Sequence, residues 1–160
     1  MPSRDIILLR HAHAEPGSRG QVDAERALTA RGRTEADTAG AWIKSQGLKP
    51  DRIVCSPAVR ARETYAHVRA IAGFAEAEED ERIYEATPGD LVDVIAADKD
   101  ADCTLLIGHN PGMESLVALL TDGASDNGRG MPTAAVVWLR LPRSAQLEPG
   151  AAEVRQFWWP

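Results

Sequence analysis

The sequence predicts one α/β domain built on a mostly parallel sheet. Short apolar runs alternate along the chain with longer segments of helical period, and no internal repeat or low-complexity linker interrupts them. Several runs are continuously apolar, as expected for parallel strands buried on both faces. The 160 residues suffice for one hydrophobic core and are too few for two ordinary domains. We therefore expect residues 1–160 to form a single three-layer α/β/α sandwich.

The first predicted strand covers residues 6–9, a continuous apolar run that ends abruptly at a polar pair. A glycine-bearing loop at 17–20 separates it from the first helix. Thr29 can cap this helix, in which apolar residues recur at steps of three and four. Gly47 is suited to end it.

The second predicted strand covers residues 52–55. A turn at Ser56-Pro57 follows, and then a helix that runs to about Gly73. The acidic stretch 76–81 is interpreted as a solvated connection, with a short strand around 82–84. The chain thus continues the alternation of strand, turn and helix.

The second half of the chain repeats this alternation. Residues 87–90, Thr-Pro-Gly-Asp, have the cap, proline and acidic residue that open a helix. A buried strand is predicted at 103–107, and Asn110-Pro111-Gly112 opens the next helix. Two final strands are predicted at 134–141 and 153–158, with a Pro-Gly turn between them. A closing hairpin would join them.

Composition excludes several classes of protein. The chain is 44% hydrophobic and 26% charged, which is typical of a globular domain and not of a disordered, collagen-like or coiled-coil chain. The net charge of -6 argues against nucleic-acid binding, which depends on cationic groups. The apolar runs are far shorter than the roughly 20 residues of a membrane-spanning helix. No signal-peptide pattern is present, so we expect a cytoplasmic protein without a membrane partner.

The two cysteines, Cys55 and Cys103, lie inside apolar runs without CxxC spacing or clustered histidines. They indicate neither a disulfide framework nor a zinc site, and we interpret both as buried small hydrophobic residues.

Cationic and imidazole residues follow three of the predicted strands. Arg10-His11 follows the first, Ser56 with Arg60 the second, and His109 the strand at 103–107. Ligands of open parallel sheets bind at the carboxyl ends of the strands, so these residues should meet at one edge. Guanidinium groups and helix N-termini match a tetrahedral oxyanion. The sequence therefore predicts a phosphoryl site that needs neither metal nor other cofactor.

The remaining histidines have simpler interpretations. His67 falls in the middle of a helix, and His13 lies two residues beyond the strand end, so both are interpreted as structural. A metal-dependent hydrolase is a competing hypothesis, because His11-Ala12-His13 could form a metal-binding pair. No further cluster of histidine and acidic residues supplies the remaining ligands.

Three motifs carry a family resemblance: Arg10-His11-Ala12, residues 56–64 (SPAVRARET) and residues 108–112 (GHNPG). In order and spacing they resemble the histidine phosphatase superfamily, and the length and GHNPG form resemble its short SixA-like branch of phosphohistidine phosphatases. Ala12 stands where the superfamily commonly has glycine. The resemblance spans nearly the whole chain and implies a phosphoglycerate-mutase-like fold.

The resemblance also implies roles for the residues. His11 would be the nucleophile and would be transiently phosphorylated, while Arg10, Arg60 and His109 would hold the phosphoryl oxygens. The second ring nitrogen of His11 would donate to a backbone carbonyl. Residues with further expected roles are Ser56 and Asn110 in phosphate binding and Glu85 as general acid, although Glu85 is equally well explained as a solvated residue.

The expected substrate is phosphohistidine on a protein domain, because so short a chain leaves no length for a lid over the site. A broad phosphomonoesterase for small phosphate esters is the alternative. A non-catalytic phosphate-binding module is an alternative of another class. A phosphoglycerate mutase would carry additional segments that this chain lacks. The sequence does not determine the oligomeric state, and the aromatic residues 157–159 could pack on the last strand or form a contact surface.

Overall fold

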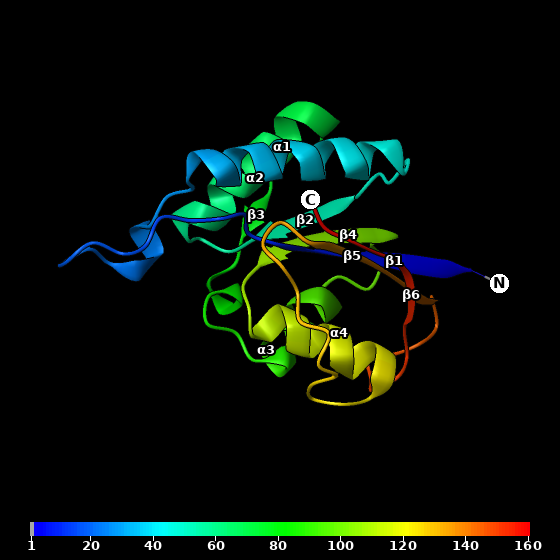
Figure 1. Ribbon diagram of the computed structural model, residues 1–160. Helices are drawn as coiled ribbons and strands as arrows, with labels where there is room; N and C mark the ends of the chain where they lie inside the picture. Colours follow the sequence, from blue (N-terminus) through cyan, green and yellow to red (C-terminus); the bar gives the residue numbers. More distant parts are fainter. Residues whose placement is uncertain (1) are drawn as a thin grey trace.

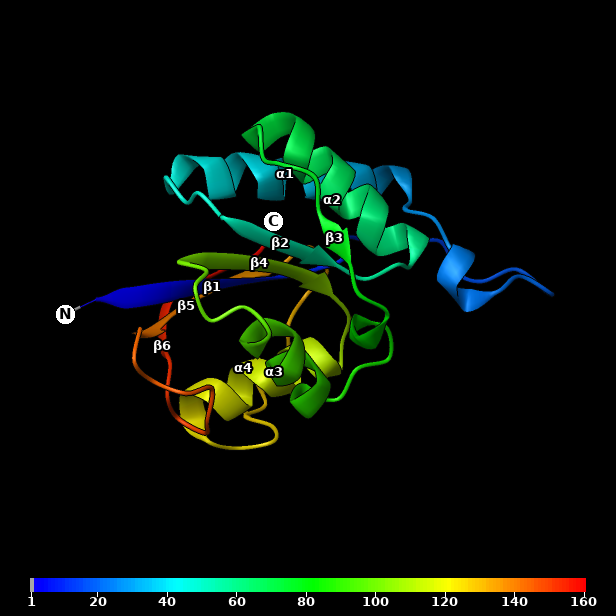
Figure 2. The same cartoon turned by 180° about the vertical axis from the view of Figure 1, so that it is seen from behind.

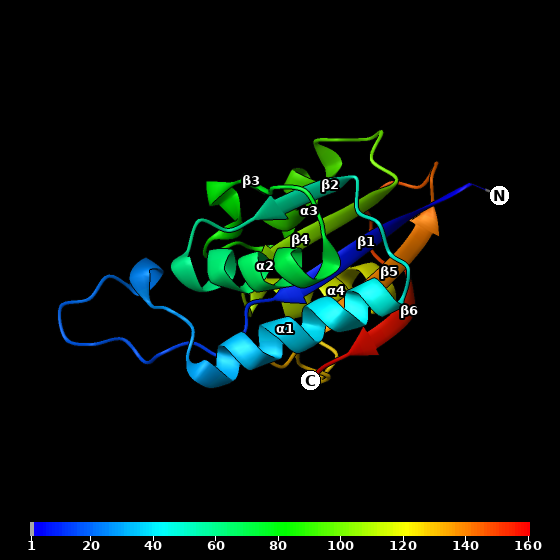
Figure 3. The same cartoon turned by 90° about the horizontal axis from the view of Figure 1, so that it is seen from above.

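The computed structural model describes residues 2–160 and shows a six-stranded sheet between two layers of helices (Figure 1). Helices α1 (Ala30–Ser45) and α2 (Val59–Ala72) cover one face of the sheet. Helices α3 (Pro88–Ala96) and α4 (Gly112–Asp122) cover the other face, as the view from behind also shows (Figure 2). From above, α1 and α2 lie side by side over the strands (Figure 3). The predicted α/β/α architecture is confirmed.

The strand order is β3-β2-β4-β1-β5-β6. Strands β3, β2, β4 and β1 run parallel, whereas β5 is antiparallel to both of its neighbours. The last two strands form the predicted hairpin. The sheet is mostly parallel, because β5 alone runs against its neighbours. The bounds are β1 (Ser3–Arg10), β2 (Arg52–Cys55), β3 (Glu78–Glu79), β4 (Cys103–Gly108), β5 (Val136–Pro142) and β6 (Glu153–Trp158).

Side chains of β1 alternate between two hydrophobic clusters. Ile6 and Leu8 pack on the side of α3 and α4, whereas Ile7 and Leu9 pack on the side of α1 and α2. All four side chains are buried. Burial on both faces explains why this strand is a continuous apolar run in the sequence.

Two predicted strands differ from the structure. Residues 81–83 form a 3-10 helix, η2 (Glu81–Ile83), instead of part of a strand, and the edge strand is β3 within the acidic stretch. Because β3 pairs with β2 through its backbone and leaves both glutamates exposed, it has no apolar pattern. Strand β5 begins at Val136 and not at Ala134, because Ala134 has a φ of 58° that breaks the extended backbone.

The predicted helix boundaries agree with the structure. The Thr29 hydroxyl accepts the Gly32 N–H at 3.0 Å, and Thr87 and Asp90 form a capping box at the start of α3. Gly47 follows α1 with a φ of 70°. Both cysteines are buried free thiols. No helix within residues 2–160 is long and apolar enough to cross a membrane.

Of the aromatic residues at the end of the chain, Trp158 packs on a helix and Trp159 is exposed. The Trp158 ring stacks on Trp42 of α1 with 5.2 Å between ring centroids. Trp159 is 55% exposed, and Phe157 contacts it edge to face. The last strand therefore uses Trp158 to pack on α1 and leaves Trp159 at the surface.

Candidate active site

The carboxyl ends of three adjacent strands bring the candidate residues together. Strands β1 and β4 are parallel, and their last paired residues are Arg10 and Gly108. His11 and His109 are the next residues, so they leave the sheet at the same edge. The His11 N–H donates to the Gly108 carbonyl at 3.0 Å, and the two imidazole rings lie 5.1 Å apart between centroids. Ser56 follows β2, the next strand in the sheet. Residues from distant parts of the sequence thus share one site.

His11 is buried and held in one tautomer. Its Nδ1 lies 2.7 Å from the Ala12 carbonyl oxygen. A carbonyl can only accept a hydrogen bond, so Nδ1 carries the proton and Nε2 retains its lone pair. Burial first, and then the charges of Arg10 and Arg60, lower the pKa of His11 to about 4. At neutral pH His11 therefore presents an uncharged, nucleophilic nitrogen.

His109 is held through Ser56. The His109 Nε2 lies 2.7 Å from the Ser56 hydroxyl oxygen, which also accepts the Ala58 N–H at 3.2 Å. When the hydroxyl donates its proton to Nε2, the neutral ring carries its own proton on Nδ1. Burial, with the charges of His11 and Arg60, lowers the pKa of His109 to about 3. Its Nδ1 is buried without a hydrogen-bond partner.

The two arginines are fixed by main-chain carbonyls. Arg10 donates from Nη1 to the Met131 carbonyl at 2.9 Å, and Arg60 donates from Nη1 to the Asp23 carbonyl at 2.9 Å. In both residues Nε is buried without a hydrogen-bond partner. A carbonyl orients a guanidinium without cancelling its charge, so the Arg10 cation remains available to an anion. Arg60 also pairs with the Asp23 carboxylate through Nη2, and its Nε remains without a partner.

Asp23 and Tyr84 are site residues that sequence reasoning missed. The Asp23 carboxylate accepts the Tyr84 hydroxyl at 2.5 Å and Arg60 Nη2 at 3.1 Å, and Arg26 donates to it at 2.9 Å. The Tyr84 hydrogen bond, followed by those of Arg26 and Arg60, holds the pKa of Asp23 below its usual range. Asp23 belongs to a short 3-10 helix, η1 (Asp23–Glu25), without apolar periodicity. Its position 37 residues before Arg60 gave no signal in the sequence.

The other predicted residues have distinct places. Ser56 is fully buried and contacts His109, so it reaches the site through that ring. Asn110 donates from Nδ2 to the Met131 carbonyl at 2.8 Å, the same oxygen that anchors Arg10. Glu85 is exposed, has a φ of 55°, and lines a pocket of about 250 Å³ that Arg60 and His109 also line.

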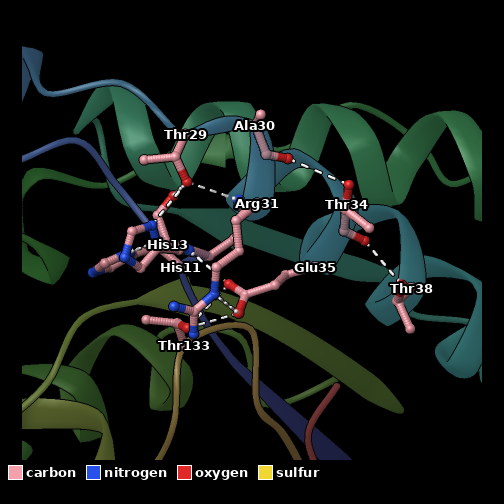
Figure 4. Close-up of polar contacts among 11 residues, drawn as sticks. His11, His13, Thr29, Ala30, Arg31, Thr34, Glu35, Thr38 and Thr133 are labelled. Atoms are coloured by element: carbon pink, nitrogen blue, oxygen red, sulfur yellow. Dashed lines mark hydrogen bonds and ion pairs between the residues drawn. The ribbon is translucent and has the colours of Figure 1, made fainter.

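The start of α1 supports the segment that carries His11 (Figure 4). Glu35 accepts the His13 N–H at 2.8 Å and the Thr133 hydroxyl at 3.0 Å, which ties the segments that follow β1 and precede β5. The Nδ1 atom of His13 lies 2.8 Å from the Thr29 hydroxyl oxygen. A Cβ atom on Gly32 would stand 1.9 Å from the His13 carbonyl oxygen, so only glycine fits there.

The remaining two histidines bond to residues other than those around His11 and His109. His13 bonds to the cap of α1, and His67 Nδ1 lies 2.7 Å from an Asp37 carboxylate oxygen on the neighbouring helix. Within the described residues, no group of three or more His, Cys, Asp and Glu side chains is placed to hold a metal ion.

A family model for the histidine phosphatase superfamily (branch 1) matches residues 6–102. The chain belongs to this superfamily. An uncharacterized protein of Mycobacterium tuberculosis is 35% identical over 93% of this chain and 98% of its own length. The SixA protein of Agrobacterium tumefaciens has the same fold, with a TM-score of 0.84 and 24% identity over 100% of both chains. The protein histidine phosphatase SixA in complex with tungstate also has a TM-score of 0.84, at 24% identity, over 98% of this chain and 97% of that chain.

Proposed function

We propose that this protein is a phosphohistidine phosphatase that hydrolyses phosphohistidine on a protein domain through a covalent intermediate on His11. One observation carries the proposal. The neutral His11 ring lies beside buried donors that have no partner of their own, namely Arg10 Nε, Arg60 Nε and His109 Nδ1. A nucleophilic nitrogen among unpartnered donors is what in-line phosphoryl transfer requires.

In the first step, Nε2 of His11 attacks phosphorus while the bond from phosphorus to the leaving nitrogen breaks. The substrate ring, protonated on its other nitrogen, takes the bonding electron pair and leaves as neutral imidazole. The charge of the transition state spreads over three equatorial oxygens, which the two arginines and His109 stabilise. The proton stays on Nδ1, which donates a hydrogen bond to the Ala12 carbonyl throughout, so the phosphorylated ring remains oriented. In the second step, water attacks phosphorus, the bond to Nε2 breaks, and phosphate leaves with His11 restored.

Three points support a protein-bound phosphohistidine as substrate. The leaving imidazole has a conjugate acid of pKa about 6.5, so it needs less protonation than an alkoxide would. The fold matches SixA of A. tumefaciens over the full length of both chains, without a large insertion that could enclose a small substrate. Tungstate, a tetrahedral oxyanion, is bound in a related SixA structure.

A kinetic comparison tests this proposal. We expect the wild-type protein to hydrolyse a phosphohistidine-bearing domain with a kcat/KM at least about tenfold above that for small phosphate esters, with activity retained in EDTA. His11→Ala should have no detectable turnover, while His67→Ala, which removes a histidine outside the site, should keep wild-type rates. A higher kcat/KM for the esters, or loss of activity in EDTA, would contradict the proposal.

The position of Glu85 favours a second candidate function, hydrolysis of phosphate esters. Glu85 lines the same pocket as Arg60 and His109, and its left-handed backbone is a conformation that non-glycine residues rarely adopt outside functional or tightly constrained sites. A carboxylic acid there could protonate a leaving alkoxide. Under this hypothesis Glu85→Gln impairs ester hydrolysis more than phosphohistidine hydrolysis, and equal losses on both substrates would count against it.

A further inference from the structure

A second pocket, of about 500 Å³, lies at the opposite end of β1 from His11. We call it the distal pocket; Arg4 of β1, Lys99 after α3 and Arg143 after β5 line it. Arg4 precedes His11 by seven residues, about 23 Å along an extended strand. Strand β1 starts at one end of the sheet, and the segment that follows it leaves from the other (Figure 1). The distal pocket is therefore separate from the candidate active site.

Arg4 is a largely buried residue whose guanidinium has no partner among residues 2–160. It is 8% exposed, its Nε is buried with no hydrogen-bond partner, and within the described chain its guanidinium forms no ion pair. Burial and the neighbouring charge of Arg143 lower the pKa of Arg4. Buried charges in folded proteins are normally paired, because an uncompensated charge in the interior is destabilising. Arg4 is thus placed where an anion would complete its surroundings.

The surrounding charges define which anion fits. Arg143 is already satisfied, because it pairs with the Asp102 carboxylate and donates to the Asp100 carbonyl. Lys99 is exposed and, within residues 2–160, forms no ion pair. Arg4 and Lys99 thus place two positive charges at one pocket, and neither has an ion-pair partner among residues 2–160. A dianionic group would neutralise both, and a guanidinium binds a phosphate group with two parallel hydrogen bonds.

The rest of the lining is apolar. Val92 of α3 and the loop residues Ala145 and Leu147 line the pocket and belong to the periphery of the hydrophobic cluster beneath α3 and α4. A volume of this size suits a small organic molecule, and such pockets combine apolar walls with a few orienting polar groups. We propose that the distal pocket binds a small molecule that carries a dianionic phosphate group next to an apolar part. This site is independent of the activity proposed for His11.

A titration with phenylphosphonate tests the distal pocket, because its carbon–phosphorus bond is not a phosphatase substrate. Amide resonances of the full chain, followed by NMR, would report the two sites separately. We expect saturable shifts at Arg4, Ala96 and residues 144–147, in addition to any at residues 109–112. Benzoate and benzenesulfonate, which carry the same ring and a single charge, should bind the distal pocket at least about tenfold more weakly. Inorganic phosphate, which lacks the apolar part, should also bind more weakly.

Two variants locate the binding. Arg4→Gln should weaken the shifts at residues 144–147 at least about tenfold, the usual loss with a charge-assisted pair, and leave those at 109–112 unchanged. Lys99→Gln, at an exposed position with little risk to folding, should weaken them by a smaller factor. Arg155→Gln, a surface arginine paired with Glu153, is the matched control and should change neither. No saturable shifts at 144–147, equal affinity for benzoate or inorganic phosphate, or equal affinity in Arg4→Gln would overturn the proposal.

Discussion

The arginines near the two ends of β1 are held in different ways. At the carboxyl end, the main-chain carbonyls of Met131 and Asp23 orient the guanidinium groups of Arg10 and Arg60, and the Asp23 carboxylate also pairs with Arg60. At the amino end, Arg4 has no orienting partner among the described residues. A cation that is already oriented stabilises a transition state without reorganisation, whereas an unanchored one becomes ordered only when a ligand arrives. The difference separates a site built for catalysis from one suited to binding alone.

The largest effect should follow from removing a charge at the preorganised end. We expect Arg60→Gln to lower kcat/KM by about 10²- to 10³-fold, the loss typical of removing one preorganised donor. The exposed Arg155→Gln removes the same charge at a distance and should leave the rate unchanged. Steady-state kinetics, with melting curves to verify folding, make the comparison. A loss below about tenfold would mean that the anchoring of Arg60 does not serve catalysis.

The rigidity of the carboxyl end can be tested through the contact between Gly32 and His13. Gly32→Ala places a methyl group against the His13 carbonyl oxygen, so we expect the free energy of unfolding to fall by about 1–3 kcal/mol. The segment that carries His11 should also shift, with a further loss of kcat. Gly89→Ala is the matched control, because its added Cβ meets only the Thr87 hydroxyl oxygen, at 3.7 Å. Equal stability of the two variants by denaturant unfolding would contradict this role for Gly32.

The lowered pKa values of the two buried histidines predict an acid-sensitive fold. In the unfolded chain both histidines become protonated below about pH 6.5. In the folded chain His11 becomes protonated only near pH 4, and His109 only near pH 3. The free energy of unfolding therefore falls as pH drops through that window, by on the order of 3 kcal/mol for His11 alone. His11→Asn, which cannot titrate there, should lose less stability between pH 7 and pH 4 than the wild type. Parallel stability curves for the two proteins would refute this linkage.

The sequence allowed the strand ends to be predicted because their signals are local. The apolar run before Arg10 and the run before His109 end at a polar residue, and parallel strands place their carboxyl ends at one edge. The burial that dominates the lowered pKa of His11 was not visible, because it depends on packing from both layers of helices. Only the smaller contribution of the arginines could be anticipated.

Long-range contacts that lack a pattern were missed. Asp23 lies in the short 3-10 helix η1, which has no apolar periodicity, and it reaches Arg60 and Tyr84 only after the core has placed α2 and η2. The edge strand β3 pairs through its backbone, so its two glutamates carry no hydropathy signal. Arg4, at the start of an apolar strand, gave no indication of its burial. In each case the tertiary structure, and not the local sequence, determines the environment.

Trapping of the phosphorylated enzyme tests the central claim most directly, namely that a neutral His11 receives the phosphoryl group. The protein would be mixed with a phosphohistidine-bearing domain, quenched at high pH where imidazole is not protonated to a better leaving group, and analysed by mass spectrometry of its peptides. We predict one phosphoryl group on His11 of the wild type and none on His11→Ala, which should also lack turnover. Phosphorylation at another residue, or turnover by His11→Ala, would contradict the mechanism.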